Sequence, residues 1–187
     1  LYKKAQTPLK WQKELFNYSK KIKIPCFSTP YDDEGVDLLK KLDSKLYKVS
    51  SFEMKDSSLV KKICNIGKPV IISTGLANLK EISEVYKVAK KSGCKKLILL
   101  YCVSSYPAKN SDFNLTNIDI LKKKFKCEIG FSDHSKDNSV AMLAISRGAR
   151  VIEKHIALDN QKDGLDIEFS IKGKEIKKFK EDMIKAW

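Results

Sequence analysis

The chain has few of the features that mark several common classes of protein. Eight glycines and five prolines in 187 residues exclude a collagen-like or linker-dominated chain. The longest apolar run covers residues 97–103 and is far too short to span a membrane. No GxGxxG turn occurs. With 42% apolar residues, the chain can bury one sizeable core and is not disordered as a whole.

Arginine is nearly absent, although the formal net charge is +14. Arg147 and Arg150 are the only arginines among 37 basic side chains, and arginine is the residue best suited to bidentate recognition of bases and phosphates. The lysines are spread over predicted helices instead of forming one stripe. A lysine-rich nucleic-acid binder therefore stays only as an alternative, and we predict neither a nucleic-acid nor a membrane partner. Such a basic field also suits a small anionic substrate.

The cysteines form no recognisable framework. Their number is odd, their spacings are wide and no CxxC occurs, which excludes a disulfide scaffold and a zinc site. We therefore expect a reducing compartment and predict a cytoplasmic protein. The five cysteines are Cys26, Cys64, Cys94, Cys102 and Cys127.

Both ends of the chain suggest a fragment. Leu1 is not Met, and residues 2–6 resemble the middle of a helix. The last helical pattern, from Ile176 to Trp187, stops without a cap. A missing leader peptide therefore says little about the intact protein.

Six short apolar runs recur along the chain, each followed by polar residues and a helical stretch. Nearly continuous apolar runs of this length are typical of strands buried on both faces of a parallel sheet. They cover residues 24–27, 46–49, 69–72, 97–103, 127–131 and 150–153.

Helix boundaries can be predicted in several of the segments between these runs. Asn78 and Glu81 have the spacing of a capping box, and Gly93 follows at the position of a C-terminal glycine. Thr7 and Pro8 predict an N-cap followed by proline in the first turn.

Six strand–helix units in succession predict an α/β protein. The two possible closures are a doubly wound open sheet and a (β/α)8 TIM barrel, and the missing glycine-rich first turn argues against the open sheet. A barrel needs eight units and about 250 residues. The sequence therefore predicts a TIM barrel that is present as a fragment.

Hydroxyl or ionisable side chains follow each predicted strand. Serine and threonine often end strands or cap helices, but in a barrel all the strand ends meet at one mouth, where active sites lie. Lys48 and Lys154 among these hydroxyls suit an oxyanion such as phosphate or carboxylate. The segments are residues 28–30, 50–53, 73–75, 104–107, 132–134 and 154–155.

The chain has two histidines, His134 and His155, which follow consecutive strands. Two neutral imidazoles on neighbouring strands can bind one divalent metal and leave positions open for water and substrate. Asp133 is either a partner of an imidazole or a helix cap. Glu53 is either an acid/base group or the partner of a lysine.

These motifs resemble the sialic acid synthase family over nearly the whole chain and in the same order. The resemblance implies a (β/α)8 barrel followed by a small antifreeze-like domain. Residues 1–187 would then be a partial catalytic domain covering strands three to eight, without the first two strands and the C-terminal domain. The matching segments are residues 27–30, 47–51, 68–75, 131–135, 148–155, 158–159, 164–166 and 169–170.

The resemblance implies that phosphoenolpyruvate is condensed with an N-acetylated amino sugar to give a nine-carbon 2-keto acid. It assigns catalytic roles to Glu53, His134 and His155. The two histidines would bind a divalent metal, manganese in first place with magnesium or cobalt as alternatives. The implied phosphoenolpyruvate ligands are Thr29, Lys48, Ser51, Ser73, Ser132 and Ser104, the last standing where some members have Asn; the implied sugar ligands are Tyr106 and Asp166.

The segment Ser50–Glu53 resembles the pseudaminic acid synthase branch, because it reads Ser-Ser-Phe-Glu where sialic and legionaminic acid synthases tend to have Gly-Ser-Gly-Glu. The expected acceptor is 2,4-diacetamido-2,4,6-trideoxy-altrose. N-acetylneuraminate or legionaminate synthesis is the alternative, and another metal-dependent barrel lyase or aldolase is a further one.

The resemblance also implies a homodimer when the protein is intact. The first two strands would supply another carboxylate and a lysine, and the terminal domain of a partner subunit would supply an arginine. We therefore expect the 187-residue chain by itself to show little activity and not necessarily to close its barrel.

Overall fold

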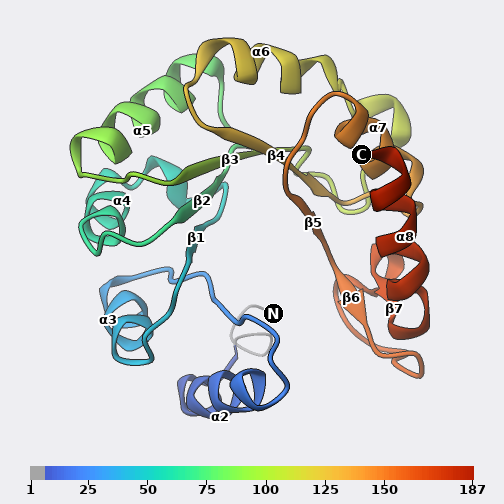
Figure 1. The fold of residues 1–187 in the computed structure, drawn as a ribbon, viewed down its shortest axis with the longest axis horizontal. Coiled ribbons are helices and arrows are strands. Elements are labelled where there is room, and N and C mark those ends of the chain that lie inside the picture. Colours follow the sequence, from blue (N-terminus) through green and yellow to red (C-terminus); the bar gives the residue numbers. More distant parts are fainter. Residues whose placement is uncertain (1–6) are drawn as a thin grey trace.

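Five parallel strands form a curled sheet with helices along its outer side (Figure 1). The computed structural model describes residues 7–187, so the helical start expected at residues 2–6 lies outside the described part. The strands are hydrogen-bonded in chain order, β1-β2-β3-β4-β5, and every neighbouring pair is parallel. This order has no reversal, which separates the sheet from a doubly wound one.

The sheet strands are β1 (Tyr47–Val49), β2 (Val70–Ser73), β3 (Leu97–Cys102), β4 (Glu128–Asp133) and β5 (Ile152–Lys154); β6 (Ile156–Ala157) and β7 (Ile171–Lys172) pair separately. The α-helices are α2 (Leu9–Lys21), α3 (Asp33–Lys41), α4 (Ser57–Cys64), α5 (Leu79–Lys91), α6 (Thr116–Lys124), α7 (Ser139–Ser146) and α8 (Ile176–Ala186). The 3-10 turns are η1 (Glu53–Lys55), η2 (Asn110–Asp112), η3 (Ile167–Phe169) and η4 (Gly173–Glu175).

Five of the six predicted strands are confirmed, and the first is wrong. In residues 24–27 no strand forms, and Ser28 alone makes an isolated parallel bridge to Tyr47. Pro25 has no N–H to donate, and the segment lies at the edge of the sheet, where Ile24 is exposed. The pair β6–β7 has no counterpart among the predicted strands.

The helix termini follow their capping chemistry. Asn78 Oδ1 accepts hydrogen bonds from the backbone N–H groups of Lys80 and Glu81 at 2.9 and 3.0 Å, and Glu81 accepts from the Asn78 N–H at 2.8 Å. This confirms the capping box of α5. Gly93 has a φ of +79°, as a C-terminal glycine requires. The start of α2 was predicted one residue too early, because Pro8, not Thr7, occupies the N-cap with an extended ψ of 132°.

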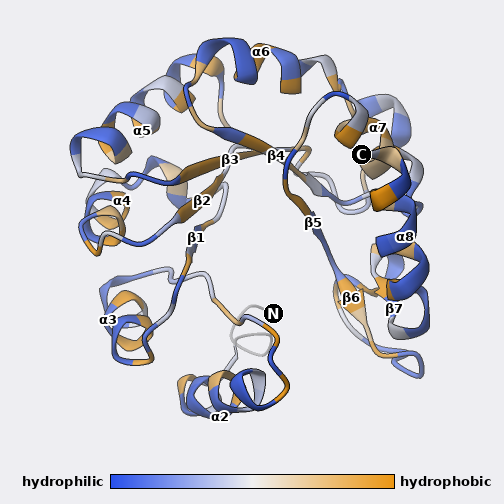
Figure 2. Cartoon of the chain, viewed as in Figure 1, coloured by the Kyte–Doolittle hydropathy of each residue, from blue (hydrophilic) through white to orange (hydrophobic). Residues whose placement is uncertain are grey.

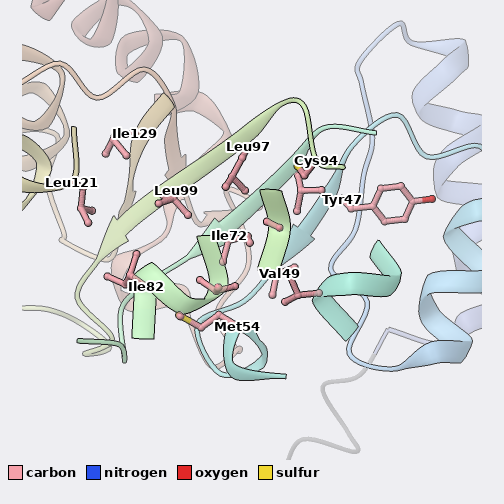
Figure 3. Packing of buried hydrophobic residues seen from close by; sticks show 14 of the residues in the cluster. Tyr47, Val49, Met54, Ile72, Ile82, Cys94, Leu97, Leu99, Leu121 and Ile129 are labelled. Carbon is pink, nitrogen blue, oxygen red and sulfur yellow. The ribbon is translucent and has the colours of Figure 1, made fainter. Parts of the chain in front are cut away.

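Successive residues of each strand face opposite sides of the sheet. On the outer side, Ile72, Leu97 and Leu99 belong to the core formed with the helices (Figure 3). Val70 belongs to the same core. The helices are apolar towards this core and polar towards solvent (Figure 2). The other alternating set faces the inside of the curl and includes Lys48.

The lysines expected on solvated helix faces are exposed, among them Lys10, Lys13, Lys20, Lys40, Lys61 and Lys122. The charge is thus spread over the outer surface. In the described part of the chain, no helix is both long enough and apolar enough to cross a membrane.

Gly130 lies where the sheet interior leaves no room for a side chain. A Cβ there would lie 2.5 Å from both Leu100 Cδ2 and the Val151 carbonyl oxygen. We therefore expect Gly130→Ala to lower the free energy of unfolding by about 1–3 kcal/mol, as overpacking typically does. Urea denaturation measures this difference.

Gly173→Ala is the matched control, because a Cβ there meets no atom closer than 3.7 Å. We expect it to change the free energy of unfolding by less than about 0.5 kcal/mol, as for an ordinary surface substitution. Equal losses in the two variants would show that close packing at Gly130 is not the cause.

Candidate active site

Four polar side chains from different strands lie on the inner face of the sheet near its C-terminal edge. Lys48 comes from β1, Ser73 from β2, Ser132 from β4 and Glu153 from β5. The strand register pairs Ser132 with Glu153. Lys48 Nζ lies 3.0 and 3.2 Å from the two carboxylate oxygens of Glu153. The contact joins β1 and β5, the first and last strands of the sheet, so the curl brings side chains from its two edges together.

Glu153 is the main residue that the sequence reasoning missed. Its Oε1 accepts a hydrogen bond from Ser132 Oγ at 2.7 Å in addition to the contact with Lys48. The available signal was the two-residue alternation, which places Glu153 on the same face as His155. The pattern of strand ends instead predicts Lys154 as the inward-facing cation.

The prediction that Lys154 offers a cation to an anionic ligand is wrong, because Lys154 does not line the inner face. Its ammonium group pairs with Asp133 at 2.9 Å and also donates to the carbonyl oxygen of Ser135. Both side chains of the pair are almost fully buried, at 3% and 0% exposure. Asp133 further accepts from the Ser135 backbone N–H at 2.8 Å, so it ties down the loop after β4 instead of orienting an imidazole.

Ser51 and Gly75 form a close-packed corner of the site. Gly75 donates its backbone N–H to Ser51 Oγ at 3.0 Å, and Ser51 Oγ lies 3.4 Å from the sulfur of Cys102. A Cβ on Gly75 would lie only 2.4 Å from Ser104 Oγ and 2.5 Å from the Cys102 sulfur. Glycine is therefore required here, because Ser104 and Cys102 already fill the space that a side chain would need. Burial raises the pKa of the Cys102 thiol, which keeps it protonated.

Two hydroxyls of the site have no partner within the described residues 7–187. They belong to Ser73 and Ser104, whose Oγ atoms are buried. A buried hydroxyl without a hydrogen bond costs free energy. Two such groups at the ends of the neighbouring strands β2 and β3 indicate a place where a ligand supplies the missing acceptor.

The two histidines are brought together, with ring centroids 5.4 Å apart. His134 is buried, and its Nδ1 lies 3.0 Å from the carbonyl oxygen of Val103. A carbonyl oxygen only accepts, so Nδ1 carries the proton and Nε2 keeps a free lone pair. Burial lowers the pKa of His134, which favours the neutral form that a metal requires.

The residues assigned to sugar binding lie beside this pair. Asp166 Oδ2 is 3.6 Å from Nδ1 of His155. The ring centroid of Tyr106 is 4.4 Å from that of His134. Phe169, which the sequence reasoning assigned to no role, packs against both histidines with centroids at 5.9 and 5.1 Å. In the described part of the chain, no three His, Cys, Asp or Glu side chains gather as a metal-binding group, so this chain offers a metal two imidazoles.

Glu53 begins the turn η1 and receives a hydrogen bond from the hydroxyl of Ser50. Burial raises the pKa of Glu53, as suits a group that holds and releases a proton. Phe52, immediately before it, is 70% exposed. Thr29 is half-buried next to the bridge at Ser28, and within residues 7–187 the structure shows no hydrogen bond from it to the other site residues. The structure thus brings Thr29 only to the edge of the site.

A comparison with known protein families shows the family to which the chain belongs. A model of the NeuB family matches residues 1–187. The chain belongs to the NeuB family. This confirms the resemblance to sialic acid synthases inferred from the motifs.

Two curated relatives within the NeuB family are equally similar to the chain. The pseudaminic acid synthase of Campylobacter jejuni is 40% identical over 177 residues, covering 95% of this chain and 52% of that protein. The N,N'-diacetyllegionaminic acid synthase of the same species is 40% identical over 179 residues, covering 95% and 54%. The chain therefore spans about half the length of the curated relatives it matches.

A solved structure confirms the fold class. The N-acetylneuraminic acid synthetase of Leptospira borgpetersenii, crystallised with citrate, superposes with a TM-score of 0.94 at 35% identity. The match covers 98% of this chain and 64% of that one. The curled sheet of this NeuB-family chain is accordingly part of an α/β barrel.

Ser73 provides a test of the ligand-binding interpretation. Since its buried hydroxyl has no partner in the described part of the chain, Ser73→Ala removes no hydrogen bond. We expect the free energy of unfolding to stay equal or to rise by up to about 1 kcal/mol. Urea denaturation without ligand measures it.

Ser44→Ala is the matched control, because Ser44 is equally buried but donates a hydrogen bond to the Leu46 carbonyl oxygen at 2.7 Å. We expect this variant to lose about 1 kcal/mol. A comparable loss in Ser73→Ala would mean that the Ser73 hydroxyl stabilises the fold itself and is not reserved for a ligand.

Proposed function

We propose that this chain forms part of a nonulosonic acid synthase. The enzyme condenses phosphoenolpyruvate with an N-acetylated amino sugar and releases phosphate. The preferred acceptor is 2,4-diacetamido-2,4,6-trideoxy-altrose, which gives pseudaminic acid. The names of the relatives support the reaction class, and the residues of the inner face support the substrate chemistry.

The observation that carries the proposal is a group of potential anion ligands, Lys48, Ser73 and Ser132, on the same inner face as the two imidazoles. Ser132 and His134 are two residues apart on one strand and its end, and Glu153 and His155 have the same spacing. Alternation therefore places all four side chains on the same face. Lys48 and the unpartnered Ser73 add a positive charge and a free donor. The arrangement suits a phosphorylated acid next to the oxygen of a carbonyl substrate.

The reaction forms one carbon–carbon bond, and at carbon 2 it replaces the carbon–oxygen bond to phosphate with a bond to an oxygen from water. Carbon 3 of phosphoenolpyruvate bonds to the aldehyde carbon of the open-chain sugar, whose oxygen takes up a proton and becomes a hydroxyl. Water then adds to carbon 2, phosphate leaves with the bridging oxygen, and carbon 2 becomes the ketone.

The side chains of this chain have distinct tasks in that sequence. Lys48, Ser51 and Ser73 bind the phosphate and carboxylate groups, with Thr29, Ser104 and Ser132 as further ligands. Tyr106 and Asp166 orient the sugar. Glu53 holds the proton that moves during aldehyde attack or water addition. Each role places a donor or acceptor where charge develops, which is how such sites lower the barrier.

His134 and His155 would hold a divalent cation, manganese in first place and magnesium or cobalt as alternatives. Their fit rests on the free Nε2 lone pair of His134 and on the adjacent imidazole of His155. Such an ion, when bound, supplies Lewis-acid polarisation of the aldehyde.

Phe52 bears on the acceptor. The two Campylobacter jejuni synthases are equally identical to this chain, so overall similarity does not choose between their sugars. Phe52 is 70% exposed and next to Glu53, where it offers an apolar surface to the acceptor. Such a surface favours a trideoxy acceptor over N-acetylmannosamine, which has a hydroxyl at the same carbon, but it does not separate the two diacetamido sugars, which differ only in configuration.

Phosphate release tests the proposed reaction. The full-length protein is incubated with phosphoenolpyruvate and Mn²⁺ and with the diacetamido altrose, the legionaminic-type acceptor or N-acetylmannosamine in parallel. We expect release with the altrose alone. Release with another acceptor keeps the reaction and changes the branch, whereas release with none of the three contradicts the condensation.

His134→Ala tests the metal ligands without relying on turnover. We expect loss of most Mn²⁺ affinity, measured by titration calorimetry, because the remaining imidazole cannot hold the ion with similar strength. Metal-dependent turnover should disappear as well. Glu128→Gln, which alters an exposed carboxylate at the start of β4, controls for loose surface binding. Unchanged Mn²⁺ affinity in folded His134→Ala would remove His134 from the site.

A further inference from the structure

The carboxylate of Glu153 contacts two groups that the proposed function assigns to the anionic substrate. Lys48 Nζ lies 3.0 Å from Oε2 and 3.2 Å from Oε1, and Ser132 Oγ donates to Oε1 at 2.7 Å. Both oxygens are therefore engaged. The contact joins β5 to β1 and β4, so one side chain links three strands across the inside of the curled sheet.

Burial makes these contacts the principal restraint on the two donors. The side chain of Lys48 is 9% exposed and Ser132 is 2% exposed, so little water is available to replace the carboxylate. Lysine has a flexible four-carbon stem and loses much rotamer freedom when it is fixed. A charge-assisted contact to both oxygens holds its ammonium group in one place.

Glu153 itself is partly open to solvent, because its side chain is 36% exposed. A carboxylate in such a position would by simple Coulomb repulsion weaken the binding of an anion nearby. Its presence among anion ligands therefore needs a reason other than contact with the substrate. Holding Lys48 and Ser132 in place is the reason that its contacts supply.

We propose that Glu153 is a positioning residue that fixes Lys48 and Ser132 for the phosphoenolpyruvate anion. This rests on the proposed function, which makes those two side chains substrate ligands. Glu153 does not itself touch the reacting atoms and acts through its two partners.

Replacement of Glu153 distinguishes a positioning role from a simple effect of its charge, because the two predict opposite changes in anion affinity. In Glu153→Gln the negative charge is lost, which by Coulomb's law alone would strengthen anion binding. The amide nitrogen can also face the Lys48 ammonium, and two donors repel each other. If Glu153 positions the donors, anion binding weakens instead. Glu153→Asp keeps the charge but is one methylene shorter, so it should weaken binding as well.

The experiment uses the full-length protein in four forms: wild type, Glu153→Gln, Glu153→Asp and the control Glu128→Gln. Titration calorimetry measures the Kd for inorganic phosphate, and steady-state kinetics give kcat and the KM of each substrate. We expect both Glu153 variants to raise the phosphate Kd and the phosphoenolpyruvate KM by about tenfold or more, which corresponds to ~1.4 kcal/mol. The sugar KM should change by less than about threefold, a split that a general loss of structure would not produce.

The outcomes distinguish this proposal from the proposed function. Equal or tighter phosphate binding in folded Glu153→Gln overturns the positioning role, and so does wild-type behaviour of Glu153→Asp. If neither variant folds, the carboxylate is structural and the proposal is overturned. Phosphate binding by wild type without phosphate release from any acceptor overturns the condensation alone. If wild type does not bind phosphate, both proposals are overturned.

Discussion

The two-residue alternation along five parallel strands is the constraint on which the rest of this structure depends. Because one set of side chains must pack against the helices, the other set is forced into the interior of the curl. On β2, Ile72 joins the outer core while Ser73 faces inward. On β4, Phe131 is part of the core while Ser132 reaches the carboxylate of Glu153. The same folding choice thus builds the core and gathers the polar groups.

The alternation also sorts two pairs of buried charges onto opposite sides of the sheet. Asp133 and Lys154 pair at full burial on one side, where the ion pair fixes the loop after β4. Lys48 and Glu153 pair on the other, where Glu153 is partly open to solvent. A fully buried pair offers nothing to a ligand, because releasing either partner would leave a buried charge without a counterion. A partly open pair can share its donors with an incoming anion. Under the proposed function, the difference in exposure therefore separates an ion pair that stabilises a loop from one that serves substrate binding.

Much of the fold could be predicted from local sequence chemistry. The apolar runs located five strands, and Asn78 with Glu81 located the start of a helix to the residue. These features depend on neighbours in the sequence, so the chain itself contains the information. The first strand could not be located in this way, because Pro25 and an edge position left only Ser28 bridging to Tyr47. Pairing at a sheet edge depends on what lies beside it, which no local pattern shows.

The sequence predicts which strand ends form the candidate site, but not which of its charged side chains pair with each other. Neighbouring residues of a strand face opposite sides of the sheet, so Glu153 and Lys154 cannot both face inward. The strand-end pattern predicts Lys154 as the inward-facing cation, whereas in β5 Lys154 pairs with Asp133 and Glu153 with Lys48. The wrong prediction for Lys154 and the omission of Glu153 are therefore the same error about which residue faces inward. The contact between Lys48 and Glu153 joins residues 105 positions apart, and it depends on the curvature of the whole sheet.

The contrast between buried and exposed residues also explains why the family can be predicted from the sequence, whereas the acceptor sugar cannot. In the proposed function, residues of the inner face bind the groups that are common to pseudaminic, legionaminic and sialic acid synthesis. The same proposal sets the acceptor against exposed side chains such as Phe52 and Tyr106, which packing does not constrain. Such positions can change without cost to the core, since a surface substitution alters stability by only about 0.5 kcal/mol. Two relatives that are named for different sugars can therefore be equally similar to one chain.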